Sequence, residues 1–234
     1  MDYEARLQRF YEQILAPGMC VVDVGAHIGR HGFEMLRLIE PHGRILLFEP
    51  LPNLFAQLDN AARSRYAGRN VQVLPYALSN QEGTSEFCIA LDALAYSGIK
   101  ERHYDTETRV SRITVEVRRL DDFVQDWPRL DYIKIDTEGA EWNVLQGSLR
   151  SIERFRPTVS FEFGENSYSA YDVSPGAVHD FFMSARYIVL DILGNELDKA
   201  SFIESSRHQA VWDYVALPEE RRSQASLLSG HADN

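Results

Sequence analysis

The sequence predicts an α/β fold in which helices cover both faces of a seven-stranded, mostly parallel sheet. Short apolar runs recur along the chain, and the early ones are each followed by a segment with helical periodicity, which is typical of buried parallel strands and their crossover helices. Two later segments alternate apolar and polar residues instead, and this pattern predicts an inserted β-hairpin. The last two apolar runs are expected to form an antiparallel C-terminal hairpin in the sheet.

The first element is an amphipathic helix from about Tyr3 to Leu15, which the breaker pair Pro17-Gly18 ends. The strands expected in the main sheet are 20–24, 44–48, 71–78, 131–135, 158–163, 187–193 and 210–217. The helices expected between them are 29–40, 52–65, 120–125, 138–152 and one that opens at Ser174-Pro175. The inserted hairpin is expected over 84–90 and 110–117, with the polar loop 92–109 between its strands. The expected organisation is an N-terminal helix (1–18), one domain (19–218) and a polar, flexible tail (219–234).

Charge and composition narrow the class of function. The net charge is −11, and an acidic surface repels phosphate backbones, so nucleic acid is not an expected partner. No signal peptide and no apolar run of about 18 residues is present, so we expect a cytoplasmic protein with no membrane contact. Cys20 and Cys88 lie in apolar segments and are expected to be buried free thiols. The sequence leaves open whether the protein forms a homo-oligomer.

The residues that follow the parallel strands carry the chemistry, because ligands bind beyond the carboxyl ends of such strands. The first strand ends in Asp23-Val24-Gly25-Ala26-His27-Ile28-Gly29. Its G-x-x-x-G spacing differs from the G-x-G-x-x-G of nicotinamide and flavin enzymes, and it resembles the first motif of class I methyltransferases, which bind S-adenosylmethionine. We therefore expect a Rossmann-like class I methyltransferase fold, with a cofactor site at Asp23, Gly25, His27 and Gly29. The alternative is a tight turn in which Asp23 accepts backbone hydrogen bonds.

The ends of the next two strands add to the expected cofactor site, which also includes Asp136 after the fourth strand. Glu49 follows the second strand, and a carboxylate there can accept both ribose hydroxyls, with Pro50 beside it. Ala77 and Leu78 end the third strand, and they can form a wall of the adenine pocket. The alternatives are a solvated glutamate at a strand end and a plain exit from a strand.

A third group of polar residues follows the fourth strand. Asp136, Glu138 and Glu141 place three carboxylates within six residues, which is costly unless cationic or hydrogen-bonding groups are close. Helix capping explains Glu138 and Glu141, because acidic residues favour the first turn of a helix. It explains Asp136 less well, since that residue still belongs to the strand end.

The motif Ile133-Lys134-Ile135 followed by Asp136-Thr137-Glu138-Gly139-Ala140-Glu141 resembles the hallmark of the FkbM-type methyltransferases. Further matching segments are Val22 to Gly29, Phe48-Glu49-Pro50, Arg119 to Phe123, Val144 to Gly147, Arg156-Pro157 and Phe161-Glu162. His27 stands where asparagine is common in that family. The resemblance implies an S-adenosylmethionine-dependent O-methyltransferase that acts on a hydroxyl of a sugar or secondary metabolite, as in natural product biosynthesis.

Methyl transfer to a hydroxyl also needs a base or a metal ion. Asp136 and Glu162 are expected to point into one pocket, and the base is one of these residues or His103. Alternatively, Asp136 and Glu162 bind Mg²⁺, since hard cations prefer oxygen ligands. Glu138, Glu141 and Tyr168 are candidates for binding the substrate, although Tyr168 can equally pack its loop onto the domain. A non-catalytic module that only binds the cofactor is the rival hypothesis.

Overall fold

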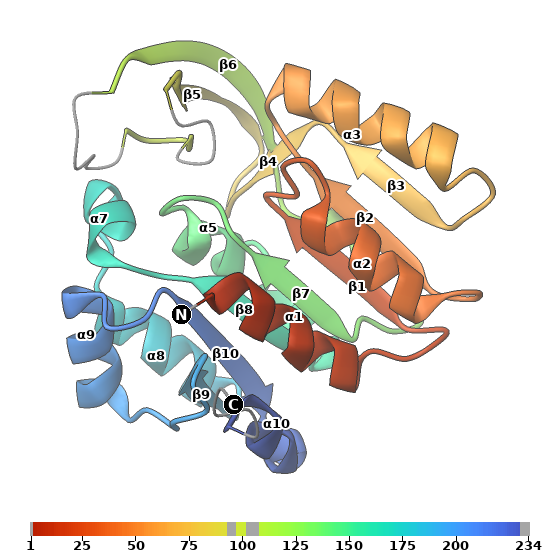
Figure 1. Ribbon diagram of the computed structural model, residues 1–234. Coiled ribbons are helices and arrows are strands. Elements are labelled where there is room, and N and C mark those ends of the chain that lie inside the picture. Colours follow the sequence, from red (N-terminus) through yellow and green to blue (C-terminus); the bar gives the residue numbers. More distant parts are fainter. Residues whose placement is uncertain (1, 93–96, 102–107, 230–234) are drawn as a thin grey trace.

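The computed structural model describes residues 2–92, 97–101 and 108–229, and it confirms the predicted seven-stranded sheet. The strand order is β3-β2-β1-β7-β8-β10-β9 (Figure 1). Neighbouring strands are parallel except those paired with β10, which runs antiparallel to both β8 and β9 and so forms the predicted C-terminal hairpin. The strands are β1 (Cys20–Val24), β2 (Arg44–Phe48), β3 (Val71–Leu74), β7 (Tyr132–Ile135), β8 (Thr158–Glu162), β9 (Tyr187–Asp191) and β10 (Asp213–Pro218).

The predicted third strand, 71–78, is wrong as a single element, because it divides at Pro75. Proline has no N–H to donate to a ladder, and the chain leaves the edge strand β3 at this residue. Residues after Pro75 form β4 (Tyr76–Leu78), which joins β6 (Val110–Arg118) and β5 (Gly83–Ala90) in a separate three-stranded sheet. This smaller sheet contains the predicted hairpin, and it lies beside the carboxyl ends of β1, β2 and β7 (Figure 1).

Helices cover both faces of the main sheet, with α1 and α2 in front of it and α8 behind it in Figure 1. The helices are α1 (Tyr3–Ile14), α2 (Arg30–Ile39), α3 (Pro52–Arg65), α4 (Leu120–Val124), α5 (Glu141–Gln146), α6 (Leu149–Phe155), α7 (Glu165–Tyr168), α8 (Pro175–Ser184), α9 (Lys199–His208) and α10 (Ser226–Ser229), with the 3-10 turns η2 (Ser169–Tyr171) and η3 (Glu219–Ala225). Among the described helices, none is long and apolar enough to cross a bilayer. Cys20 and Cys88 are buried free thiols, as predicted.

The single helix predicted over 138–152 is also wrong, since α5 and α6 replace it. Glu138 and Gly139 have φ angles of 57° and 111°, which belong to the left-handed region, so the helix cannot begin before Glu141. The chain leaves the helical ladder again at Gly147, where a Cβ atom would lie 2.0 Å from the carbonyl oxygen of Ser79. Close packing of the chain on the end of β4 therefore divides the helix.

Both ends of the described chain pack together on the sheet. Leu7 and Phe10 of α1 are buried, and the Arg6 guanidinium donates hydrogen bonds to the carbonyl oxygens of Ile192 and Leu228. The tail predicted from Glu219 onward is helical as far as Ser229, and Leu228 is buried. These contacts fix α1 along the sheet, with its first turn near the carboxyl ends of β7 and β8 (Figure 1).

At Gly25, the chain after β1 passes very close to the chain after β7 at the edge of the sheet. Its φ is +81°, and a Cβ atom there would lie 1.8 Å from the carbonyl oxygen of Asp136. The chain after β1 and the chain after β7 can therefore lie side by side only because residue 25 has no side chain. Gly68 has nearly the same φ, +82°, but a Cβ atom placed on it would have nothing within 4 Å.

We expect Gly25→Ala to lower the free energy of unfolding by about 3 kcal/mol or more, because it adds a backbone clash to the left-handed strain. The matched control Gly68→Ala carries only the strain and should cost about 1 kcal/mol. Urea denaturation of both variants measures the difference. Equal losses would contradict the close approach of Gly25 to Asp136.

Candidate active site

A cavity of about 370 Å³ lies beyond the carboxyl ends of β1, β2, β7 and β8. Ten of the residues predicted for the site line it, and they come from five separate segments of the sequence. They are Asp23, Gly25, His27, Glu49, Pro50, Ala77, Leu78, Asp136, Glu138 and Glu162. The fold therefore gathers these side chains in one place, while their roles stay predictions.

The loop after β1 brings backbone donors to the cavity. Gly25 and Ala26 donate their N–H groups to the carbonyl oxygen of Phe48, which ties the loop to the end of β2. Gly29, at φ +85°, is the N-cap of α2, and within the described part of the chain this helix has no side-chain cap. Gly29 itself does not line the cavity. The loop thus places the positive end of α2 next to the cavity, a setting that suits a carboxylate ligand.

Glu49 is a fixed part of the cavity wall. Its side chain is buried, and its two oxygens accept hydrogen bonds from the backbone N–H groups of His27 and Leu51, each at 2.9 Å. Burial raises the pKa of Glu49 to about 7, although these two hydrogen bonds oppose the shift. Each carboxylate oxygen can accept a second hydrogen bond, so the group can still bind a diol.

An apolar wall lies next to Glu49. Leu51 and Leu54 pack with Ala77 and with Phe87 of the smaller sheet in a second hydrophobic cluster, separate from the main core. Ile99 packs against this cluster, and all five residues line the cavity. No sequence motif points to Phe87 or Ile99, because the inserted hairpin reaches the cavity only through the fold.

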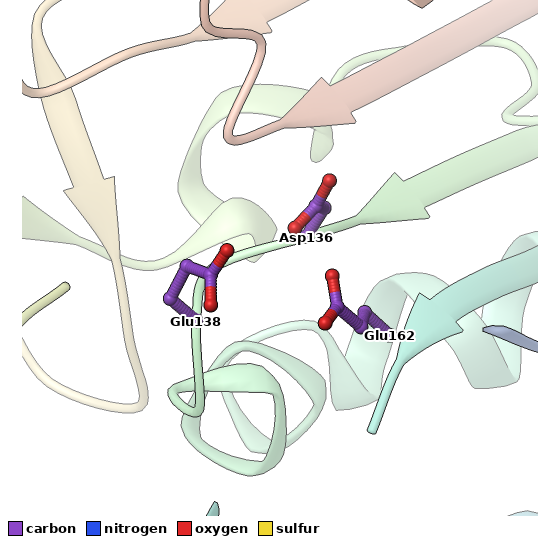
Figure 2. Close-up of side chains that lie close together, drawn as sticks. All are labelled: Asp136, Glu138 and Glu162. Carbon is purple, nitrogen blue, oxygen red and sulfur yellow. The ribbon is translucent and has the colours of Figure 1, made fainter. Parts of the chain in front are cut away.

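Three carboxyl groups point toward one another beyond β7 and β8 (Figure 2). Oxygen atoms of Asp136, Glu138 and Glu162 all lie within 4.8 Å of one another. Burial alone would raise the pKa of Asp136, but the ammonium group of Lys134 and a hydrogen bond from Glu162 hold that pKa below its ordinary value. Burial, and then the negative charge of Asp136, raise the pKa of Glu162 well above its ordinary value. These opposite shifts favour placing the negative charge of the pair on Asp136 and its proton on Glu162.

Lys134 supplies the positive charge in this part of the cavity. Its Nζ atom lies 3.0 Å from Oδ2 of Asp136 and 3.9 Å from Oδ1 of Asp23, and its side chain is buried. Burial disfavours the ammonium form, but the two aspartates outweigh burial and raise the pKa of Lys134. A lysine inside the apolar strand Ile133-Lys134-Ile135 is the sequence signal for this role, since an unpaired charge is not tolerated there.

Like Gly29, the predicted residues Glu141 and Tyr168 do not line the cavity. The Oε1 atom of Glu141 accepts hydrogen bonds from the backbone N–H groups of Thr137 and Gly139 and from the Thr137 hydroxyl, so Glu141 shapes the turn before α5 and does not line the cavity. Tyr168 stacks on Phe163 with ring centroids 4.4 Å apart, and it packs its loop onto the domain. His103 lies outside the described residues.

Comparisons with known proteins agree with this architecture. The family model of the methyltransferase FkbM domain matches residues 23–189, which is more than half of the 234 residues. Methyltransferase sdnD of Sordaria araneosa is 28% identical over 154 residues, which cover 54% of this chain and 59% of that protein. Methyltransferase 1 of Beauveria bassiana is 28% identical over 143 residues, which cover 54% of this chain and 57% of that protein. The chain thus spans less than three fifths of the length of these two relatives.

The fold has counterparts among solved structures. A candidate rRNA methylase from Clostridium thermocellum superposes with a TM-score of 0.52 at 10% identity, over 92% of this chain and 94% of the other. At that identity the likeness concerns the fold alone. The domain match over residues 23–189 establishes the family, and this chain belongs to the FkbM methyltransferases.

Proposed function

We propose that this protein is an S-adenosylmethionine-dependent O-methyltransferase that acts on a hydroxyl of a neutral small molecule, such as a sugar or a secondary metabolite. The observation that carries the proposal is one cavity that contains both the glycine loop with Glu49 and the carboxyl pair of Asp136 and Glu162. The first set of residues suits an adenosyl ligand, and the second suits removal of a proton from a hydroxyl. The family supports methyl transfer as the reaction.

The cavity fits the proposed cofactor on several grounds. Its volume of about 370 Å³ is within the ordinary range for small-ligand sites. The Glu49 carboxylate would accept the ribose hydroxyls, and the apolar wall around Leu54 and Phe87 would cover the adenine. Oδ1 of Asp23 is buried with no hydrogen-bond partner among the described residues, which is costly in the absence of a ligand. When bound, the cofactor supplies a methyl group on a positively charged sulfur.

Asp136 is the proposed base. Lys134 keeps it ionised, so it can accept the proton of an acceptor hydroxyl, while Glu162 donates a hydrogen bond to it and keeps it in place. Two carboxyl groups this close hold one proton between them, as in other paired acids. The resulting negative charge also favours a cationic cofactor over its neutral product.

A Mg²⁺ ion bound by Asp136 and Glu162, with Glu138 as a third ligand, is the alternative to proton transfer. The position of Lys134 argues against it. The ammonium group lies 3.0 Å from Asp136 and already pairs with this carboxylate, and the raised pKa of Glu162 disfavours the ionised form that would bind a cation. We therefore propose the metal-free mechanism.

Charge supports a small neutral acceptor. The net charge of −11 disfavours phosphate backbones, and the carboxyl cluster at the reacting end of the cavity disfavours anionic acceptors for the same reason. The rival proposal, a non-catalytic module, requires that no acceptor be methylated, so an acceptor screen separates the two.

The affinity for S-adenosylhomocysteine, the demethylated product, should increase about tenfold from pH 6 to pH 8. Ribose hydroxyls donate to the ionised form of Glu49, so binding lowers a pKa that is about 7 in the free protein, and affinity falls as pH falls through 7. Isothermal titration calorimetry measures this dependence. Glu49→Gln should bind more weakly and lose most of the pH dependence. An affinity that stays constant or improves toward pH 6 would contradict the role of Glu49.

Asp136→Asn and Glu162→Gln should differ sharply in methyl transfer. Asp136→Asn removes the base and should lower kcat by about 100-fold or more. Glu162→Gln keeps a neutral hydrogen-bond donor beside Asp136 and should lower kcat less than about tenfold. The measurement is formation of S-adenosylhomocysteine with a panel of hydroxylated small molecules, together with circular dichroism to confirm folding.

Chelation provides the control for this comparison. In the proposed mechanism, excess EDTA leaves kcat unchanged. If both variants lose activity equally and EDTA abolishes the wild-type activity, the site uses a metal ion and the proton-transfer mechanism is wrong.

A further inference from the structure

Two oppositely charged side chains at the cavity are not used by the chemistry described so far. Glu4 comes from the first turn of α1 and Arg30 from the first turn of α2, and both line the cavity. Nη1 of Arg30 lies 3.6 Å from Oε2 of Glu4, which is too long for a good hydrogen bond. Both side chains are about half exposed, at 53% for Arg30 and 42% for Glu4. Each therefore retains capacity to bind a ligand group.

A chain of hydrogen bonds to buried side chains holds the Glu4 carboxylate in place. Its Oε2 atom forms a hydrogen bond with Nε2 of His31, and Nδ1 of His31 lies 3.0 Å from the Tyr11 hydroxyl. His31 and Tyr11 are both buried, so this chain of hydrogen bonds links Glu4 to the interior of α1 and α2. The hydrogen bond from His31 lowers the pKa of Glu4, which is therefore ionised at neutral pH. The Glu4 carboxylate is thereby held at the cavity.

A buried acceptor lies in the same part of the cavity. Asp23 is 1% exposed, and its Oδ1 atom has no hydrogen-bond partner among the described residues. The ammonium Nζ of Lys134 lies 3.9 Å from this atom, beyond hydrogen-bond distance. Glu4 is close enough to Asp23 to raise its pKa, although burial is the largest cause of that shift. The carboxyl groups of Glu4 and Asp23 thus face the cavity beside the Arg30 guanidinium and the start of α2, which has no side-chain cap among the described residues.

We propose that Glu4 and Arg30 bind the amino-acid end of the cofactor, Glu4 receiving the α-ammonium group together with Asp23 and Arg30 receiving the α-carboxylate. This inference rests on the proposed function, since it concerns the same cavity and the same ligand. Opposite charges side by side are complementary to a zwitterion, and a guanidinium matches the planar geometry of a carboxylate. Helix α1 is then part of the cofactor site and not only a cover for the sheet.

Calorimetry with two ligands tests the proposal. S-adenosylhomocysteine carries the amino-acid end, whereas 5′-deoxy-5′-methylthioadenosine has the same adenosine thioether without it. Glu4→Gln keeps the hydrogen bond to His31 but removes the charge, and it should weaken binding of S-adenosylhomocysteine about tenfold. Arg30→Gln should have a similar effect and leaves the Glu4–His31 contact in place. Neither variant should change the affinity for methylthioadenosine by more than about twofold.

Glu12→Gln is the matched control, because Glu12 is an exposed acid on the same helix and lies outside the cavity lining. It should leave both affinities unchanged. The inference is overturned if either Glu4→Gln or Arg30→Gln binds S-adenosylhomocysteine as the wild type does, or if a variant loses affinity for both ligands equally. It is also overturned, without harm to the proposed function, if the wild type binds both ligands equally well. A folded wild type that binds neither ligand would overturn the proposed function as well.

Discussion

The buried ammonium group of Lys134 determines the chemistry of the cavity. Strands β1 and β7 place Asp23 and Lys134 in register, and Asp136 follows two residues later, so one cation serves two carboxylates at the edge of the sheet. Burying these charges would be costly unless they compensate one another. Because Lys134 stabilises ionised Asp136, the negative charge of Asp136 in turn raises the pKa of Glu162, where burial acts in the same direction. The proposed division of roles between the two acids follows from this one contact.

Backbone geometry holds the charged groups where they can act on one ligand. The absence of a side chain at Gly25 lets the chain after β1 approach the carbonyl of Asp136, and the loop then ties itself to the end of β2. Glu49 is fixed by the same loop through the N–H of His27. The Glu49 side and the acid side of the cavity are thus joined by short covalent and hydrogen-bonded connections, which favours a preorganised site.

Features encoded by neighbouring residues could be predicted from the sequence. The strands at 20–24 and 44–48, the glycine loop and Glu49 depend on local apolar runs and turn residues, and they appear where expected. The division of the predicted strand 71–78 at Pro75 also had a local signal, namely the proline itself. The left-handed backbone at Glu138 had none, whereas the unpredicted helix α9 had one in the Asp198 cap at its start. Glu4 and Phe87 reach the cavity only through contacts between segments distant in sequence, so no local pattern could place them.

A crystal structure with S-adenosylhomocysteine bound tests the central claim most directly. We expect ribose hydroxyls within hydrogen-bond distance of Glu49, and a sulfur atom that faces the side of the cavity formed by Asp136 and Glu162. A ligand bound outside this cavity, or one whose sulfur faces away from both acids, would contradict the proposed arrangement.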